Sequence, residues 1–444
     1  MRVLSPGIVS VSRILLGSAH SRFTFSILCW MVFWNFRAAM KLEIERFFDS
    51  AFDAAPADTP KKSTFTKARA KLKASAFIEL NEQLNHQFAG QCAAQNLQDR
   101  WRGLHLLGID GSTLRLPNSE EVVDHFGGMQ PKNGKFVPMA RFSFLHDLLT
   151  NVTQAAVITS YHTGEGQHAW DLVCSHANAL SCFLFDRGYF DGSLPFLMAA
   201  LYTNFIVRVP VKAFAKAQQF VKSGKKECEI QLPIPARIKK QLEACGVTFK
   251  GDSLTVRLVR VELNTGEVEV LMTNLLDAGL YPAEEFDKVY HLRWNIEESY
   301  KSCKCKVEIE NWSGKTVASV EQDFHAGVLN LNLVTSIAFL LQPAIDARRT
   351  QTSPPSEQQT PQLKGKDGRR GRKHHYKANI KRGLGVIRDH LCELLTSCTA
   401  RTTELAQRIT VRLKEDLSLV RPGRDYPRNH RPPRIYAAPY KPIA

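Results

Sequence analysis

The pattern of hydrophobic and polar positions predicts an α/β core in the middle of the chain. Two short apolar runs, at 104–110 (LHLLGID) and 181–186 (SCFLFD), each end in a carboxylate. Continuous apolar runs of this length are typical of buried strands. We interpret the residues that follow Asp110 (GSTLRLP) as a turn and a second strand. Further elements are expected as strands at 136–147, 153–159 and 204–211 and as a helix at 168–179.

Helical patterns surround this core. Within 40–100, Ile44, Phe47 and Phe48 recur at spacings of three or four residues, which places them on one face of a helix. The same periodicity predicts long helices at 282–306 and 317–341 and a further helical segment at 384–415.

The stretch between the last predicted core strand and the helix at 282 has a different character. Two alternating runs, SLTVRLVRVEL and EVEVLMTNL, flank the turn sequence Asn264-Thr265-Gly266. Alternating runs around a short glycine-containing turn predict a β-hairpin. We therefore interpret 212–280 as a β-rich insertion within the α/β fold.

A strong excess of basic residues indicates a polyanionic partner. Lys and Arg number 59 against 43 for Asp and Glu, a net charge of +16. Such a surplus favours nucleic acid or an anionic membrane surface. Basic residues cluster at 61–73, at the start of a helical pattern, and at 364–382, where nine Lys or Arg accompany one acid. Each tract fits phosphate binding, with a solvated or solubilising surface as the alternative.

The N-terminal apolar run at 23–34 (FTFSILCWMVFW) needs its own interpretation. Its twelve residues are fewer than the roughly 20 that a membrane-spanning helix requires. A buried helix is the first interpretation, and a signal peptide, a true start at Met40 and a membrane role of this segment are the alternatives. No membrane is expected among the partners of the protein. The ten cysteines form no Cys-x-x-Cys pair, which favours reduced thiols in a cytoplasmic protein and gives no zinc spacing.

The acidic ends of the two core strands suit metal-dependent chemistry on phosphodiesters. Asp110 and Asp186 can converge if their strands are adjacent, and a helix packed across the sheet can add a third carboxylate. Mg²⁺ prefers oxygen ligands and needs few protein carboxylates, which leaves positions for phosphate and water. Two such ions about 4 Å apart can activate the attacking oxygen and stabilise the leaving oxygen.

The helix at 282–306 carries the most specific pattern. In YHLRWNIEESYKSCK, Tyr290, Arg293, Glu297 and Lys304 stand at offsets of 0, 3, 7 and 14, which places them on one helical face. A carboxylate flanked by cations along one stripe fits a metal ligand beside phosphate-binding groups.

These motifs resemble the DDE transposases of the insertion-sequence group founded by insertion sequence four, marked by a Y-x2-R-x3-E-x6-K signature. The four helix residues fit that spacing, while 108–113 (GIDGST) and 185–190 (FDRGYF) resemble the segments of the first and second aspartates. The similarity covers roughly 60–340. One departure is a Gln-Asp-Phe sequence ending at Phe324, where a Gln-Glu pair is more usual.

The resemblance implies an α/β, ribonuclease-H-like catalytic domain: a mixed sheet flanked by helices and interrupted by the β-rich insertion. It implies that Asp110, Asp186 and Glu297 are catalytic and bind Mg²⁺ or Mn²⁺. Water would cut the element's end, and the freed 3′-OH would attack DNA. The DNA-binding residues expected on the same basis are Tyr290, Arg293, Lys304 and Arg187. An aromatic residue of the insertion region could stack a flipped base, the candidates being Phe205, Phe214, Phe220 and Phe249.

Together these arguments predict a cut-and-paste DNA transposase that acts on double-stranded DNA, is associated with the nucleoid and uses no small-molecule cofactor. A homodimer is implied by the resemblance alone. A catalytically inactive DNA-binding derivative and a plain metal-dependent nuclease are the alternatives. The expected organisation is a helical, DNA-binding N-terminal region at 1–100, catalytic segments at 101–211 and 281–345 around the insertion at 212–280, a basic linker at 346–383, and a helical segment with a basic tail at 384–444.

Overall fold

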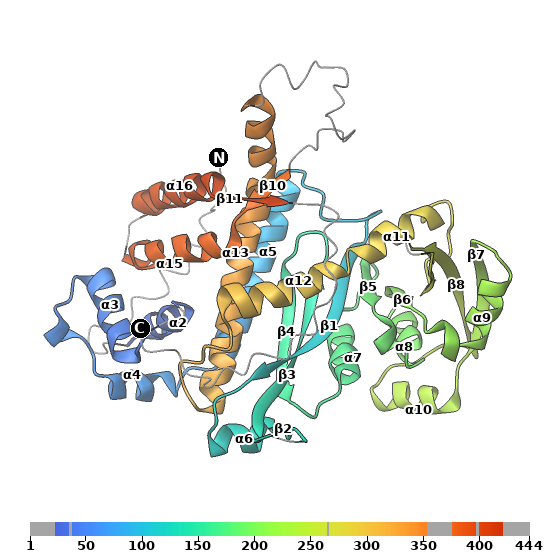
Figure 1. Ribbon diagram of the computed structural model, residues 1–444, viewed down its shortest axis with the longest axis horizontal. Coiled ribbons are helices and arrows are strands. Elements are labelled where there is room, and N and C mark those ends of the chain that lie inside the picture. Colours follow the sequence, from blue (N-terminus) through green and yellow to red (C-terminus); the bar gives the residue numbers. More distant parts are fainter. Residues whose placement is uncertain are drawn as a thin grey trace. The chain divides into compact units, whose positions relative to one another are not determined.

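The computed structural model describes residues 23–34, 38–132, 134–263, 266–352, 375–396 and 399–420. The chain divides into two compact units (Figure 1). We call Cys92–Ser302 the central unit, and the described residues up to Gln91 and from Cys303 the terminal unit.

The central unit is built on a nine-stranded mixed sheet (Figure 1). Strand β1 pairs antiparallel with β3, which pairs antiparallel with β4, and on its other edge β1 pairs parallel with β5 and β5 with β6. This arrangement confirms the predicted ribonuclease-H-like mixed sheet. The strands of this part are β1 (His105–Arg115), β2 (Gly128–Met129), β3 (Val137–Asp147), β4 (Thr153–Ser160), β5 (Ser181–Phe185) and β6 (Asn204–Arg208).

The insertion extends this sheet. Strand β9 (Val268–Thr273) pairs antiparallel with β6, and β8 (Ser253–Glu262) and β7 (Glu227–Pro233) follow in order. The predicted hairpin is confirmed as β8 and β9, with Glu262 opposite Val268. Two helices accompany the strands, α9 (Ala215–Lys222) and α10 (Ala236–Ala244). The domain boundaries drawn from the sequence stay a prediction.

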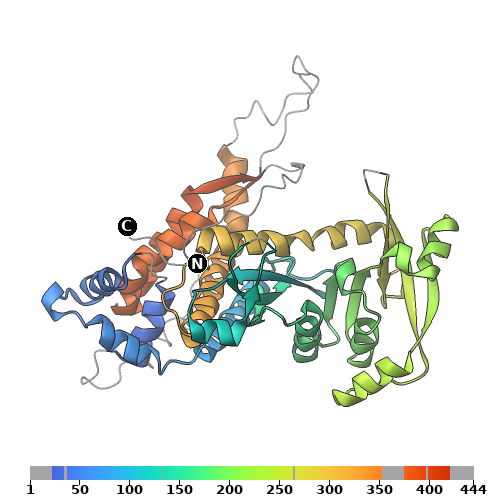
Figure 2. The ribbon, with the colours of Figure 1, turned by 60° about the horizontal axis from the view of Figure 1, so that its bottom comes forward.

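Helices cover both faces of the sheet, in the pattern that strand geometry dictates. Successive side chains of a strand point to opposite faces. Ile109 and Phe183 therefore pack on one face with α7 (Glu165–His176) and α8 (Leu194–Ala200). Leu106 and Leu184 pack on the other face with Tyr290 of α11 (Ala283–His291). Figure 2 shows α11 and the following α12 (Trp294–Ser302), in yellow, on the side of the sheet opposite the green α7 and α8.

Two sequence predictions about this unit are wrong. The turn expected after Asp110 is absent, because β1 continues to Arg115 and pairs with β3 without interruption from Leu107 to Arg115. This pairing gives the backbone N–H and C=O groups of the segment their hydrogen-bond partners. The single helix expected at 282–306 is instead α11, α12 and a π-helical turn, η4 (Cys303–Val307). Between α11 and α12 the backbone tightens to bonds three residues apart, such as Arg293 N–H to the Tyr290 carbonyl at 3.0 Å.

The terminal unit is mainly helical around its own core. The core contains fully buried side chains such as Met31, Phe47, Phe65 and Val334. Its elements are α2 (Phe25–Phe33), α3 (Met40–Phe52), η1 (Pro56–Asp58), α4 (Lys62–Arg69), α5 (Ser75–Ala94, which ends across the boundary), α13 (Val317–Thr352), α15 (Ile380–Thr396), α16 (Thr399–Glu415), and the paired strands β10 (His375–Ala378) and β11 (Leu417–Val420). The interpretation of the run at 23–34 as a buried helix is confirmed.

One helix among the described residues is long and apolar enough to cross a membrane, by length and composition. It is the Val317–Arg348 part of α13, and 61% of its most apolar stretch is buried inside the protein. This burial is that of a core helix, as the packing of Val334 in the terminal core indicates.

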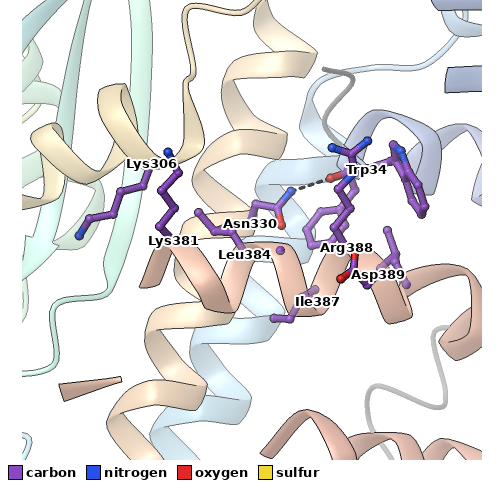
Figure 3. A pocket seen from close by; sticks show the side chains of 11 residues that line it. Trp34, Lys306, Asn330, Lys381, Leu384, Ile387, Arg388 and Asp389 are labelled. Carbon is purple, nitrogen blue, oxygen red and sulfur yellow. Dashed lines mark hydrogen bonds between the residues drawn. The ribbon is translucent and has the colours of Figure 1, made fainter. Parts of the chain in front are cut away.

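A pocket of about 400 Å³ lies within the terminal unit (Figure 3). Asn330 of α13 lines this pocket, and its Nδ2 donates a hydrogen bond to the Phe33 carbonyl at 2.6 Å. Beside it, the wholly buried Glu43 carboxylate accepts from Trp34 Nε1 at 2.9 Å and from Arg388 Nη2 at 3.0 Å. This network ties α2 and α3 to α15.

We expect Glu43→Ala to lower the free energy of unfolding by about 3–5 kcal/mol, because it leaves the Arg388 charge and the Trp34 donor without their buried partner. The matched control is Glu45→Ala in the same helix, whose pair with the exposed Lys41 at 3.7 Å contributes at most about 0.5 kcal/mol. Urea unfolding followed by circular dichroism measures both. Equal losses in the two variants would contradict a structural role for the network.

Candidate active site

The register of the parallel strands brings the two aspartates side by side. Pairing runs from His105 opposite Ser181 to Gly108 opposite Leu184, and continuing it places Asp110 opposite Asp186. Adjacent strands lie about 4.8 Å apart, and residues at matching positions point to the same face. Both aspartates therefore share the face that α11 and α12 cover. Asp110 lies within β1, and Asp186 directly follows β5.

The third predicted carboxylate, Glu297, lies in the first turn of α12. Arg293 Nη2 is 3.4 Å from Glu297 Oε1, and the Arg293 side chain is only 7% exposed. Burial acts to lower the pKa of Arg293, but the surrounding acidic groups, among them the Asp186, Glu297 and Asp110 carboxylates, outweigh it, and the pKa is raised. The structure thus places one buried guanidinium among all three carboxylates.

Asp110 lies in a partly buried environment that favours its protonated form. Burial raises its pKa to about 6, with smaller contributions in the same direction from Glu165 and Glu297. Its own neighbour Gly111 opposes the shift by donating its N–H to Asp110 Oδ1 at 2.9 Å, as does the Arg293 charge. A half-buried carboxylate beside other carboxylates creates a negative potential that favours a cation.

Tyr290 connects α11 to the strand that leads into Asp186. Its hydroxyl donates to the Phe185 carbonyl at 3.2 Å and lies 3.5 Å from Asp186 Oδ1. Burial raises the pKa of Tyr290, so the hydroxyl keeps its proton and remains a donor. The contacts of Tyr290 and Arg293 are therefore with the carboxylates and their strands.

Sequence reasoning missed Arg208 at the end of β6. The pairing of Phe185 with Val207 places Arg208 next to Asp186, and Arg208 Nη1 is 3.9 Å from Asp186 Oδ1. Arg208 Nη2 also pairs with Glu269 Oε1 of β9 at 2.8 Å. The available signal was a charged residue that ends an otherwise apolar strand, NFIVR.

Glu165 and Tyr300 were missed as well. Glu165 begins α7, forms an ion pair with Arg141, and contributes to the raised pKa of Asp110. Tyr300, in α12, donates its hydroxyl to the backbone carbonyl of Asp110. Neither residue belongs to a spacing that distinguishes it in the sequence.

The remaining predicted residues lie in several places. Arg187 is exposed in η2 (Arg187–Tyr189), directly after Asp186. Lys304 lies in η4, which belongs to the terminal unit, and burial lowers its pKa. Of the four aromatic candidates for base stacking, Phe205, Phe220 and Phe249 are buried in the sheet core, and Phe214 is half-buried with its ring 5.6 Å from that of Phe190.

The donor set of the site fits a divalent cation. Asp110, Asp186 and Glu297 offer only carboxylate oxygens, the ligands that Mg²⁺ and Mn²⁺ prefer. Within the part of the chain that the structure describes, no three acidic, histidine or cysteine side chains already stand close enough to hold a metal ion. Each carboxylate instead has a separate partner within the protein: Gly111 for Asp110, Tyr290 for Asp186 and Arg293 for Glu297.

Comparison with known proteins bears on the same region. The family described as "Transposase DDE domain" matches residues 101–333. The transposase InsG for insertion sequence element IS4 of Escherichia coli (strain K12) is 26% identical over 239 residues, which are 53% of this chain and 52% of InsG. The match thus spans about half the length of that relative. It agrees with the resemblance to the insertion-sequence-four group.

A solved structure, the piggyBac transposase synaptic complex with hairpin DNA, aligns over 87% of this chain and 74% of its own. Its TM-score is 0.37 and its identity 9%. The matched family domain covers half of the chain and contains Asp110, Asp186 and Glu297. The chain belongs to the transposase DDE domain family.

Proposed function

We propose that this protein is a DNA transposase that hydrolyses phosphodiesters at the ends of its element and joins the freed 3′-OH to target DNA. One observation carries the proposal: Asp110 and Asp186 are neighbours on one face of the sheet, and the helix that bears Glu297 packs on that face through Tyr300. The three residues follow one another in the order that the family resemblance requires.

In this proposal Asp110, Asp186 and Glu297 hold Mg²⁺ or Mn²⁺. The metal, when bound, activates the attacking oxygen and stabilises the leaving oxygen. The chain's own residues orient the ligands: Arg293 holds Glu297, and Tyr290 holds the backbone and carboxylate at Asp186. Because both side chains are buried, their proposed role is to position the carboxylates, while phosphate contact by Tyr290 and Arg293 stays a prediction.

Exposed cations are proposed to bind the DNA backbone. Arg187 stands beside Asp186. The predicted basic cluster at 61–73 has five exposed lysines in α4 and on either side of it: Lys61, Lys62, Lys67, Lys71 and Lys73. Arg69 departs from that expectation, since it is buried and pairs with Asp323 at 2.9 Å. Most of the basic tract at 364–382 lies outside the described residues. Two DNA ends must meet, so a homodimer is part of the proposal, as is action at the nucleoid.

Removal of the metal tests the proposal directly. With Mg²⁺, the protein is expected to cut DNA carrying the flanks of its own gene at the element boundaries, and excess EDTA is expected to lower the rate by at least about 10³-fold, since it removes the ions that activate the attacking oxygen and stabilise the leaving oxygen. Sequencing gels of end-labelled DNA locate the cuts, and added Mn²⁺ should restore them. Binding without cleavage would indicate the inactive DNA-binding derivative, and cuts at random positions the plain nuclease.

A further inference from the structure

Tyr300 occupies a position in the central unit that parallels that of Tyr290. Its side chain is buried, and its hydroxyl donates to the Asp110 carbonyl and accepts from the Phe144 N–H at 3.3 Å. Asp110 and Phe144 are direct partners in the β1–β3 ladder. The hydroxyl therefore bonds to both strands at the level of Asp110.

The ring of Tyr300 is fixed by aromatic packing on the same face of the sheet. Its centroid is 5.1 Å from that of Phe142 and 4.9 Å from that of Phe144, both in β3. Contacts of this geometry favour one ring orientation. The hydroxyl is thus directed at the Asp110 backbone by packing that does not depend on the hydroxyl itself.

Tyr300 also belongs to the helix that carries Glu297. The two residues are three positions apart in α12, which places them on one helical face about 4.5 Å apart along the axis. Tyr290 makes the equivalent connection at the other aspartate, from α11 to the Phe185 carbonyl that precedes Asp186. Each aspartate is therefore fixed through a backbone carbonyl by a tyrosine of the helical segment that covers the site.

We propose that Tyr300 is a positioning residue that sets the separation of Asp110 from Glu297 and so the affinity of the site for a divalent cation. This inference rests on the proposed function. The hydroxyl holds the strand of the first ligand against the helix of the third, and groups that orient metal ligands commonly contribute 10- to 100-fold, in order of magnitude, to metal affinity.

The test measures Mn²⁺ binding without DNA, from the electron paramagnetic resonance signal of free Mn²⁺. Tyr300→Phe keeps the ring packing and removes the hydroxyl, so the dissociation constant is expected to rise about tenfold. The matched control is Tyr281→Phe, a half-buried tyrosine of the same unit whose ring packs on Trp101, and it should bind Mn²⁺ as the wild type does. Circular dichroism checks that each variant is folded.

A second variant separates positioning from a general loss of stability. Replacement of Tyr300 by 4-aminophenylalanine retains an N–H donor toward the Asp110 carbonyl, and Mn²⁺ affinity should remain within about threefold of the wild type. Tenfold weaker binding by this folded variant, or unchanged binding by Tyr300→Phe, would overturn the positioning role alone. Absence of Mn²⁺ binding by the wild type would overturn the proposed function and this inference together.

Discussion

Asp110→Asn is expected to abolish metal-dependent cleavage of element-end DNA, lowering the rate by at least about 10³-fold, or about 4 kcal/mol of transition-state stabilisation. The substitution keeps the shape of the side chain and removes the charge that a divalent cation requires. DNA binding in Ca²⁺ should stay within about twofold of the wild type, because the exposed cations that are proposed to contact phosphates are untouched.

The same variant has an expected effect on stability that separates lost chemistry from lost folding. Burial raises the pKa of Asp110 in the folded protein to about 6 from 3.8, so the folded state binds this proton more tightly than the unfolded state does. The ionised group therefore destabilises the metal-free fold at pH 7, and stability falls as the pH rises from about 4 to 6. Asp110→Asn should leave the unfolding free energy in EDTA unchanged or raise it by about 1–2 kcal/mol.

The control for this experiment is Asp171→Asn, an exposed acid of α7 that bonds to Gln167 at 2.9 Å. It should cleave at the wild-type rate. If Asp110→Asn retained metal-dependent cleavage at the element boundaries, the assignment of Asp110 as a ligand would be wrong. If Asp110→Asn lost cleavage and also unfolded at a lower temperature than the wild type, the lost activity would be explained by lost stability.

The second large effect is expected in the terminal unit. A chain that begins at Met40 would lack α2, whose buried side chains include Met31, Val32 and Phe33. Burying each such side chain contributes about 1.5–3 kcal/mol, so the loss summed over the helix approaches the about 5–15 kcal/mol that stabilises a typical protein. We expect the truncated protein to be recovered mainly in aggregates.

A single substitution makes the same test in the full chain. Met31→Asp places a charge at a position with no exposure and is expected to lower the unfolding free energy by at least about 4 kcal/mol. Phe25→Asp in the same helix is the control, because Phe25 is 59% exposed, and a change below about 1 kcal/mol is expected. Chemical denaturation compares the two. Equal tolerance of both substitutions would show that α2 does not belong to the core.

Much of the candidate site could be predicted from the sequence. The apolar runs before Asp110 and Asp186 predicted buried strands because an all-apolar segment of that length has to be covered on both faces. The spacing of Tyr290, Arg293 and Glu297 matched the family signature although the helix is interrupted at Arg293, and the family match agreed with the segments that contain these residues. Local pattern and residue order therefore established the fold class and the candidate ligands.

Local sequence pattern did not predict the structure where pairing between distant strands determines the backbone conformation. Gly111 and Ser112 have the composition of a turn, yet the ladder with β3 keeps β1 extended through them. Between α11 and α12 the backbone hydrogen bonds join residues three apart, and the spacing of hydrophobic residues does not predict this change.

The sequence by itself determined which residues are candidates for the chemistry, because residue type, spacing and the family resemblance all depend on the order of residues along one chain. Only the tertiary structure determined which side chains contact and position these residues. The register of β5 and β6 places Arg208 beside Asp186, and the packing of α12 brings the Tyr300 hydroxyl to the Asp110 backbone. These contacts join residues tens to hundreds of positions apart, and their geometry depends on strand register and helix packing, which single-chain periodicity does not encode.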